Sequence, residues 1–121
     1  MSIQTRSNLH DTIAFEVGDD WLIAVSCTNA DGTPMDLTGA ALEWKLADVD
    51  TGHIFATLTV GSGITIEAAV SGIANTCLIW LTHAVTATIA PGFYRDQLRV
   101  TTAQNLISTQ MKGRIQALPV I

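Results

Sequence analysis

The residues best able to do chemistry in this sequence are closely spaced acidic side chains. In the segment DVDTGH, Asp48, Asp50 and His53 lie near one another, and carboxylates and imidazoles are common ligands of metal ions. A calcium loop, however, needs more oxygen ligands, including a distant bidentate carboxylate. The residues after His53, IFATL, have the pattern of a strand. We therefore predict a solvated hairpin turn at 48–53 and no metal site.

Other candidate catalytic groups do not form a recognisable pattern. Asp19 and Asp20 are adjacent, and adjacent strand residues point to opposite faces, so they are predicted to enter a turn rather than to act as an acid–base pair. The histidines lack metal-ligand spacing, and the serines lack a nucleophile-elbow context. These residues are His10, His53, His83, Ser26, Ser62, Ser71 and Ser108. Because no nucleophile, base and orienting group can be assigned, we expect a protein that is not an enzyme and binds no cofactor.

Composition limits the class of protein further. The chain has 121 residues, of which 48% are hydrophobic and 14% charged; this suits a single folded domain over 1–121, with 1–11 as an N-terminal arm. An average domain has about a quarter charged residues, so the deficit suggests that partners cover part of the surface. The net charge is −5, with six Lys and Arg residues scattered along the sequence, so nucleic-acid binding is not expected. Neither a membrane span nor a signal peptide is visible.

The elements that must position any site are strands. Apolar residues recur with a period of two, and turn signals recur about every ten residues, as in an all-β sandwich or barrel. The predicted strands are 12–17, 20–28, 40–48, 53–60, 64–67, 73–82, 93–102 and 106–118, with a helical turn at 83–90 and a bulge or bend at Gly113. We predict an all-β fold, an immunoglobulin-like antiparallel β-sandwich of seven to nine strands.

The core is expected to include Trp21, Cys27, Trp44, Cys77 and Tyr94. The order of the two cysteines and Trp44 imitates the Cys…Trp…Cys signature of immunoglobulin domains, although no tyrosine stands two residues before Cys77. Two interpretations of the cysteines stay open. They are either two buried free thiols, which intracellular folding favours, or an inter-sheet disulfide. With Cys77, the residues Ile73, Ile79 and Leu81 are expected to point inward.

The same alternation places large side chains on the outside of the sandwich. Leu78 and Trp80 are then expected to point outward, where large apolar residues indicate an interface, and Trp is enriched at binding hot spots. Phe93, on the outward phase of its strand beside Arg95 and Arg99, is expected to extend this patch. The alternatives are an inverted phase, or a loop that covers Trp80.

The sequence also carries an ordered series of turns and strands. Gly18-Asp19 precedes a strand, the turn ADGTPMDLTGA at 30–40 precedes Trp44, and PGFYRDQLRV at 91–100 precedes the segment TAQNLISTQMKGRIQAL. This order resembles small immunoglobulin-like or fibronectin-like domains of tailed-bacteriophage virion proteins, including the N-terminal domains of phage upper-baseplate proteins. The resemblance covers about 12–118 and rests on turn and strand patterns rather than on catalytic motifs.

The resemblance implies a virion structural protein of the tail or baseplate region, made in the bacterial host cytoplasm. Such a protein is expected to form a homo-oligomer and to bind other virion proteins, with no nucleic acid, membrane or cofactor as a partner. One alternative is a capsid decoration protein on the phage head. Another is a carbohydrate-binding or adhesin-type module, for which an aromatic content of 6% is low.

Overall fold

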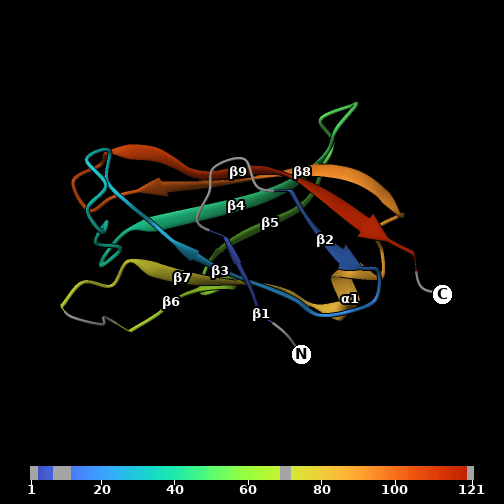
Figure 1. Cartoon of the computed structure of the whole chain (residues 1–121), viewed down its shortest axis with the longest axis horizontal. Helices are drawn as coiled ribbons and strands as arrows, with labels where there is room; N and C mark the ends of the chain where they lie inside the picture. The colour runs from blue at the N-terminus through green and yellow to red at the C-terminus, as the bar shows by residue number, and fades with distance from the viewer. Residues whose placement is uncertain (1–2, 7–11, 69–71, 120–121) are drawn as a thin grey trace.

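The computed structural model describes residues 3–6, 12–68 and 72–119 of the chain (Figure 1). The elements in chain order are β1 (Ile3–Arg6), β2 (Thr12–Glu16), β3 (Trp21–Ser26), β4 (Ala41–Asp48), β5 (Ile54–Val60), β6 (Gly63–Ile66), β7 (Thr76–Leu81), α1 (His83–Thr86), β8 (Gly92–Thr101) and β9 (Ile107–Leu118). Each predicted strand is present within a few residues of its predicted bounds. Within the described residues, no helix has the length and apolarity needed to cross a membrane.

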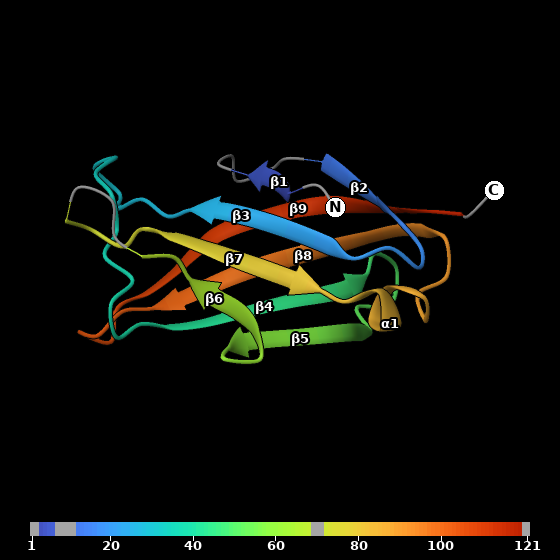
Figure 2. The same ribbon diagram turned by 90° about the horizontal axis from the view of Figure 1, so that it is seen from below.

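The strands are arranged as two layers. Their hydrogen-bonded order is β1-β3-β7-β6-β5-β4-β8-β9-β2, and in Figure 1 β3, β7 and β6 lie below β4, β8 and β9. A short parallel pairing joins the layers where Thr59 lies opposite Gly63 and Val60 opposite Ile64. Figure 2 shows the same layers after a 90° turn, with β3 and β7 crossing β8 and β9 at an angle. The prediction of an all-β, immunoglobulin-like sandwich is confirmed.

The sheet is mixed, however, and not purely antiparallel as predicted. Among the described strands, β1 pairs in parallel with β3, and β2 pairs in parallel with β9. Residues 3–6, assigned from the sequence to an N-terminal arm, therefore form an edge strand; the rest of the predicted arm lies outside the described residues. Alternation of apolar residues identifies a strand but carries no information on the direction of its neighbour, which explains the difference.

Strand alternation builds the core between the layers. The five residues expected there are at most 5% exposed: Trp21, Cys27, Trp44, Cys77 and Tyr94. Trp21 stacks on Phe15 with ring centroids 4.8 Å apart and meets Trp44 edge-on at 6.0 Å, so one side chain of β3 contacts both β2 and β4. Ile73, expected inward, is 37% exposed because it precedes the first residue of β7.

The cysteines do not occupy the positions that the immunoglobulin signature suggested. Cys77 lies on β7 opposite Val25 of the neighbouring strand β3, so both cysteines belong to one layer, and both are free and buried. This corrects the alternative of an inter-sheet disulfide. The tyrosine corner is instead at Tyr94, whose hydroxyl donates to the carbonyl oxygen of Ala90 at 2.5 Å. The position two residues later, where immunoglobulin domains carry their second cysteine, holds Asp96.

Two local features shape the strand ends. Gly63 has φ of +100°, and a Cβ there would lie 2.7 Å from Cδ2 of Leu58, so the β5–β6 turn needs a glycine on both conformational and steric grounds. The bulge in β9 shifts the register between Leu98 and Arg99 of β8. It falls at Gln110 and not at Gly113, which pairs regularly with Asp96.

Candidate interaction surfaces

The segment at 48–53 forms the predicted hairpin turn. Oδ1 of Asp48 accepts hydrogen bonds from the backbone N–H groups of Asp50 at 2.7 Å and of Thr51 at 3.0 Å. These two donors lower the pKa of Asp48, that of Thr51 contributing most. The carboxylate thus holds the turn between β4 and β5. Across the described part of the chain, no group of three or more His, Cys, Asp or Glu side chains could hold a metal ion; His10 and Ser71 lie outside the described residues.

Asp20 and Trp80 are joined at the corner beside α1. Oδ1 of Asp20 accepts a hydrogen bond from Nε1 of Trp80 at 3.2 Å and from the backbone N–H of His83 at 2.8 Å. Nδ1 of His83 lies 3.2 Å from the same oxygen. The backbone N–H of His83 is the main group that lowers the pKa of Asp20. Trp80 remains 46% exposed, so the loop after β7 does not cover it.

Thr86 ties the same corner to the turn before β3. Its side chain is fully buried, and its hydroxyl accepts from the backbone N–H of Gly18 at 3.1 Å and donates to the carbonyl oxygen of Asp19 at 2.7 Å. The turn before β3 is therefore held by Thr86 from one side and by the Asp20–His83 bond from the other. Asp19 stabilises this corner through its backbone carbonyl, and Asp20 stabilises it through its carboxylate.

The predicted patch is divided between two surfaces. Leu78 and Trp80 lie on the outward phase of β7, whereas Phe93, Arg95 and Arg99 lie on the outward phase of β8. β7 and β8 belong to different layers, and both face the core with their alternate residues, so their outward side chains point away from each other. Phe93 is 46% exposed. The structure therefore places two groups of candidate interface residues on opposite sides of the sandwich.

The outer side of the β4-β8-β9 layer carries the basic side chains. We call this surface the basic face. Of the six Lys and Arg residues in the chain, it holds all five whose side chains the structure describes. They are Lys45, Arg95, Arg99, Lys112 and Arg114. Glu43 accompanies them, with one carboxylate oxygen 3.3 Å from Nζ of Lys45. A chain with net charge −5 thus presents one face on which positive side chains outnumber negative ones.

Like charges are neighbours on the basic face. Arg95 of β8 lies directly opposite Arg114 of β9, an arrangement that destabilises an antiparallel pair. The guanidinium of Arg114 lies 4.3 Å from the ring centroid of Phe93, which holds both side chains at the surface through a cation–π contact. Arg95 and Lys112 line a shallow hollow of about 360 Å³, with Ile54 at its side. Charged and apolar groups are therefore mixed on this face.

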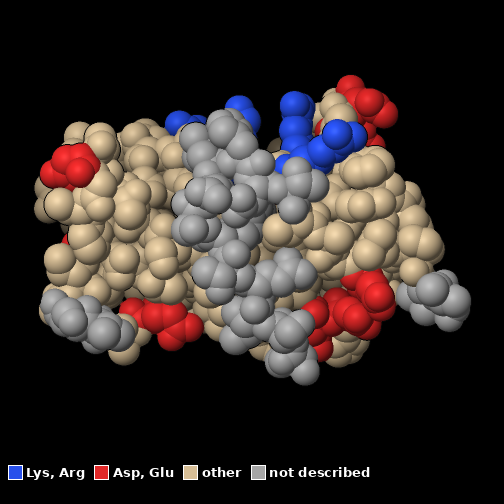
Figure 3. Space-filling view, in the orientation of Figure 1, with Lys and Arg blue, Asp and Glu red and all other residues tan. Residues whose placement is uncertain are grey.

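Acidic side chains are distributed differently. In Figure 3, Lys and Arg gather along the upper edge, over β8 and β9; Asp and Glu lie at the ends, along the lower edge and, in one group at the upper right, beside the basic side chains. Near α1, Glu16, Asp19 and Asp20 line one hollow of about 250 Å³ together with Phe15 and Trp21. We call these three acidic residues the acidic corner. The acidic corner thus lies apart from the basic face and carries the opposite charge.

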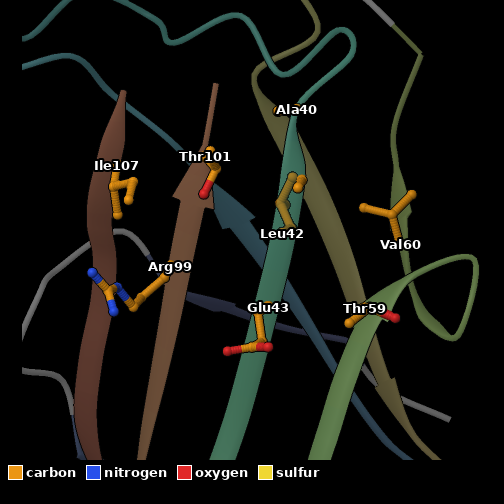
Figure 4. A pocket seen from close by; sticks show the side chains of 9 residues that line it. Ala40, Leu42, Glu43, Thr59, Val60, Arg99, Thr101 and Ile107 are labelled. Atoms are coloured by element: carbon orange, nitrogen blue, oxygen red, sulfur yellow. The ribbon is translucent and has the colours of Figure 1, made fainter. Parts of the chain in front are cut away.

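A second hollow opens at the other end of the basic face. It measures about 500 Å³ and is lined by residues of β4, β5, β8 and β9. Figure 4 shows Arg99 and Glu43 extending along its floor, with Ile107 on β9 and Val60 at the end of β5 at its sides. Ile107 is 62% exposed and Val60 44%. The hollow is broad and shallow, and its walls are flat strands, which suits contact with another protein surface better than enclosure of a small molecule.

Sequence reasoning missed the basic face although its signal was present. Lys45, Lys112 and Arg114 each occupy the outward phase of their strands, as Arg95 and Arg99 do. The residues are far apart in the sequence, and only the strand order places β4, β8 and β9 side by side. The alternation along each strand could have shown that these side chains point outward. It could not have shown that the three strands lie next to one another.

Comparison with known proteins gives matches among solved structures. No protein-family model and no curated protein matches the sequence. The N-terminal domain of phage TP901-1 ORF48 is similar at 9% identity and a TM-score of 0.53, covering 98% of this chain and 95% of that chain. CopC from Methylosinus trichosporium OB3b has 13% identity, a TM-score of 0.48, and coverage of 94% and 88%. The cysteine protease inhibitor EhICP2 from Entamoeba histolytica has 12% identity, a TM-score of 0.47, and coverage of 96% and 94%. At 9% identity, the similarity to the phage domain shows a shared fold alone.

Proposed function

We propose that this chain is a structural protein of a tailed-phage particle, in the tail or baseplate region, that assembles through repeated protein–protein contacts. The observation that carries the proposal is the pair of exposed surfaces on opposite sides of one rigid sandwich. Trp80 lies on one side, and Phe93 with five basic residues lies on the other. A domain that must join neighbours on two sides needs such surfaces, and aromatic and Arg side chains dominate binding energy at interfaces.

The phage setting is supported by two further features. The order of turns and strands resembles virion domains of tailed phages, and the fold is similar to that of the N-terminal domain of phage TP901-1 ORF48. The chain also has few charged residues, 14% in all, as expected where assembly covers much of a surface. A non-enzymatic role accords with the hydrogen bonds of Asp20 and Asp48, whose carboxylates hold turns.

The test is quantitative mass spectrometry of purified phage particles, with heads and tails separated and copy numbers referred to a major capsid protein. We expect the chain in the tail fraction in a small number of copies. Hundreds of copies in the head fraction would instead support capsid decoration. Absence from both fractions would contradict a virion role, and a glycan-array signal lost on Trp80→Ala would then favour the carbohydrate-binding alternative.

A further inference from the structure

The basic face holds like charges close together. Arg95 and Arg114 are placed opposite each other, which costs folding free energy in the isolated chain. Glu43 lies on this face and contacts Lys45, and the turn at 48–53, which carries Asp48 and Asp50, adjoins it beside Arg95. Positive side chains that outnumber the negative ones around them are expected where an acidic partner binds.

The chain itself offers an acidic counterpart. Glu16 and Asp19 are exposed, and they line the hollow at the acidic corner together with Asp20. The exposed Trp80 adjoins this corner through its hydrogen bond to Asp20, as the exposed Phe93 adjoins Arg114 on the basic face. Each surface therefore combines charges mainly of one sign with an exposed aromatic ring, and the predominant signs are opposite.

From this complementarity we propose that the basic face of one copy of this chain binds the acidic corner of a second copy. The inference rests on the proposed function, since it assumes a chain that assembles with itself. Arg95 and Arg114 face Glu16 and Asp19 of the neighbouring copy, and Phe93 and Trp80 supply apolar area at the two sides of the contact. Nucleic acid is a poorer fit, because the net charge of −5 repels a polyanion from the rest of the molecule.

The experiment uses two charge-reversed variants of the full chain. The first carries Arg95→Glu and Arg114→Glu, which reverses the two charges of the basic face that make the proposed contact. The second carries Glu16→Lys and Asp19→Lys, which reverses the acidic corner. A matched control, Asp36→Lys with Glu67→Lys, changes net charge as much as the second variant does, at exposed positions outside both surfaces. Near-ultraviolet circular dichroism establishes that every variant is folded.

Sedimentation velocity then measures association. We expect the wild-type chain and the control to associate at an ionic strength of about 0.01 M, and the association constant to fall at least about tenfold near 1 M, where screening is strong. Each reversed variant alone should remain monomeric, because the positions that meet in the proposed contact then carry charges of the same sign. An equimolar mixture of the two variants should associate, since complementary surfaces are again present.

Several outcomes would overturn the inference. They are a wild-type chain that stays monomeric at low salt, a control that loses association as the reversed variants do, and a mixture that fails to associate. A duplex DNA probe that binds the wild-type chain, and does not bind the variant with the reversed basic face, would assign this face to nucleic acid instead. Because the proposed function is tested by particle composition, a monomeric chain found in phage tails would refute self-association alone.

Discussion

Nε1 of Trp44 donates a hydrogen bond of 2.9 Å to Oδ2 of Asp96 inside the core. Trp44 is fully buried and Asp96 is 2% exposed. Asp96 follows the tyrosine corner by two residues, so this carboxylate stands where immunoglobulin domains place a disulfide cysteine. At this position immunoglobulin domains form a disulfide bond between the two layers. This chain instead forms a hydrogen bond between β4 and β8.

Replacing Asp96 with alanine should destabilise the fold by about 1–3 kcal/mol, because the buried N–H of Trp44 loses its acceptor. Urea unfolding followed by circular dichroism measures the change. The double variant Asp96→Leu with Trp44→Phe removes both polar groups. It should lose less unfolding free energy than the sum of the losses in the single variants Asp96→Leu and Trp44→Phe. Strict additivity would contradict an energetic coupling between the two side chains.

Thr86→Val should also cost about 1–3 kcal/mol, since the isosteric side chain leaves the backbone groups of Gly18 and Asp19 without their hydroxyl partner. Thr88→Val is the matched control. Its hydroxyl bonds only locally to Val85 in the described structure and is exposed, so this change should stay within about 0.5 kcal/mol. Equal urea midpoints for the two variants would show that the α1 corner does not depend on Thr86.

Stability should fall as the solution becomes acidic. Backbone N–H donors lower the pKa of Asp20 and of Asp36, through His83 and Thr38 respectively. A carboxyl whose pKa is lowered in the folded state adds stability above its unfolded pKa of about 3.9, and loses that stability as pH falls through the folded pKa. Urea midpoints measured from about pH 6 downward should decrease most below about pH 4. In Asp20→Asn this decrease should be smaller, and an unchanged decrease would exclude Asp20 as a contributor.

Arg95→Gln should stabilise the isolated chain by roughly 0.2–1 kcal/mol at low salt, because it removes the like charge opposite Arg114. The gain should disappear at high salt, where the repulsion is screened. Lys112→Gln also removes one positive charge, but from a position opposite the neutral Gln97. It should therefore stabilise the chain less than Arg95→Gln does. Thermal unfolding of both variants at two ionic strengths checks the comparison, and equal gains would mean that total charge, rather than this pair, sets the effect.

Much of the local structure was predictable because strand patterns and turn residues act over short ranges. The alternation in 93–102 predicted both the strand β8 and the burial of Tyr94, and the composition of 48–53 predicted its hairpin turn. The failures concern relationships between distant segments. The sequence pattern suggested that Cys77 takes the place of the second immunoglobulin cysteine. That place is on β8, whereas Cys77 is on β7, and spacing along the sequence cannot distinguish these two strands.

The candidate surfaces likewise depend partly on local sequence and partly on the arrangement of distant segments. The sequence by itself determined that Trp80, Phe93, Arg95 and Arg99 point outward, since side-chain direction alternates along a strand. Only the tertiary structure decided that Trp80 and Phe93 lie on opposite layers, and that three further basic residues join the arginines of β8. Strand order is set by long-range pairing and packing in three dimensions, so the position of one surface patch relative to another is absent from any single segment.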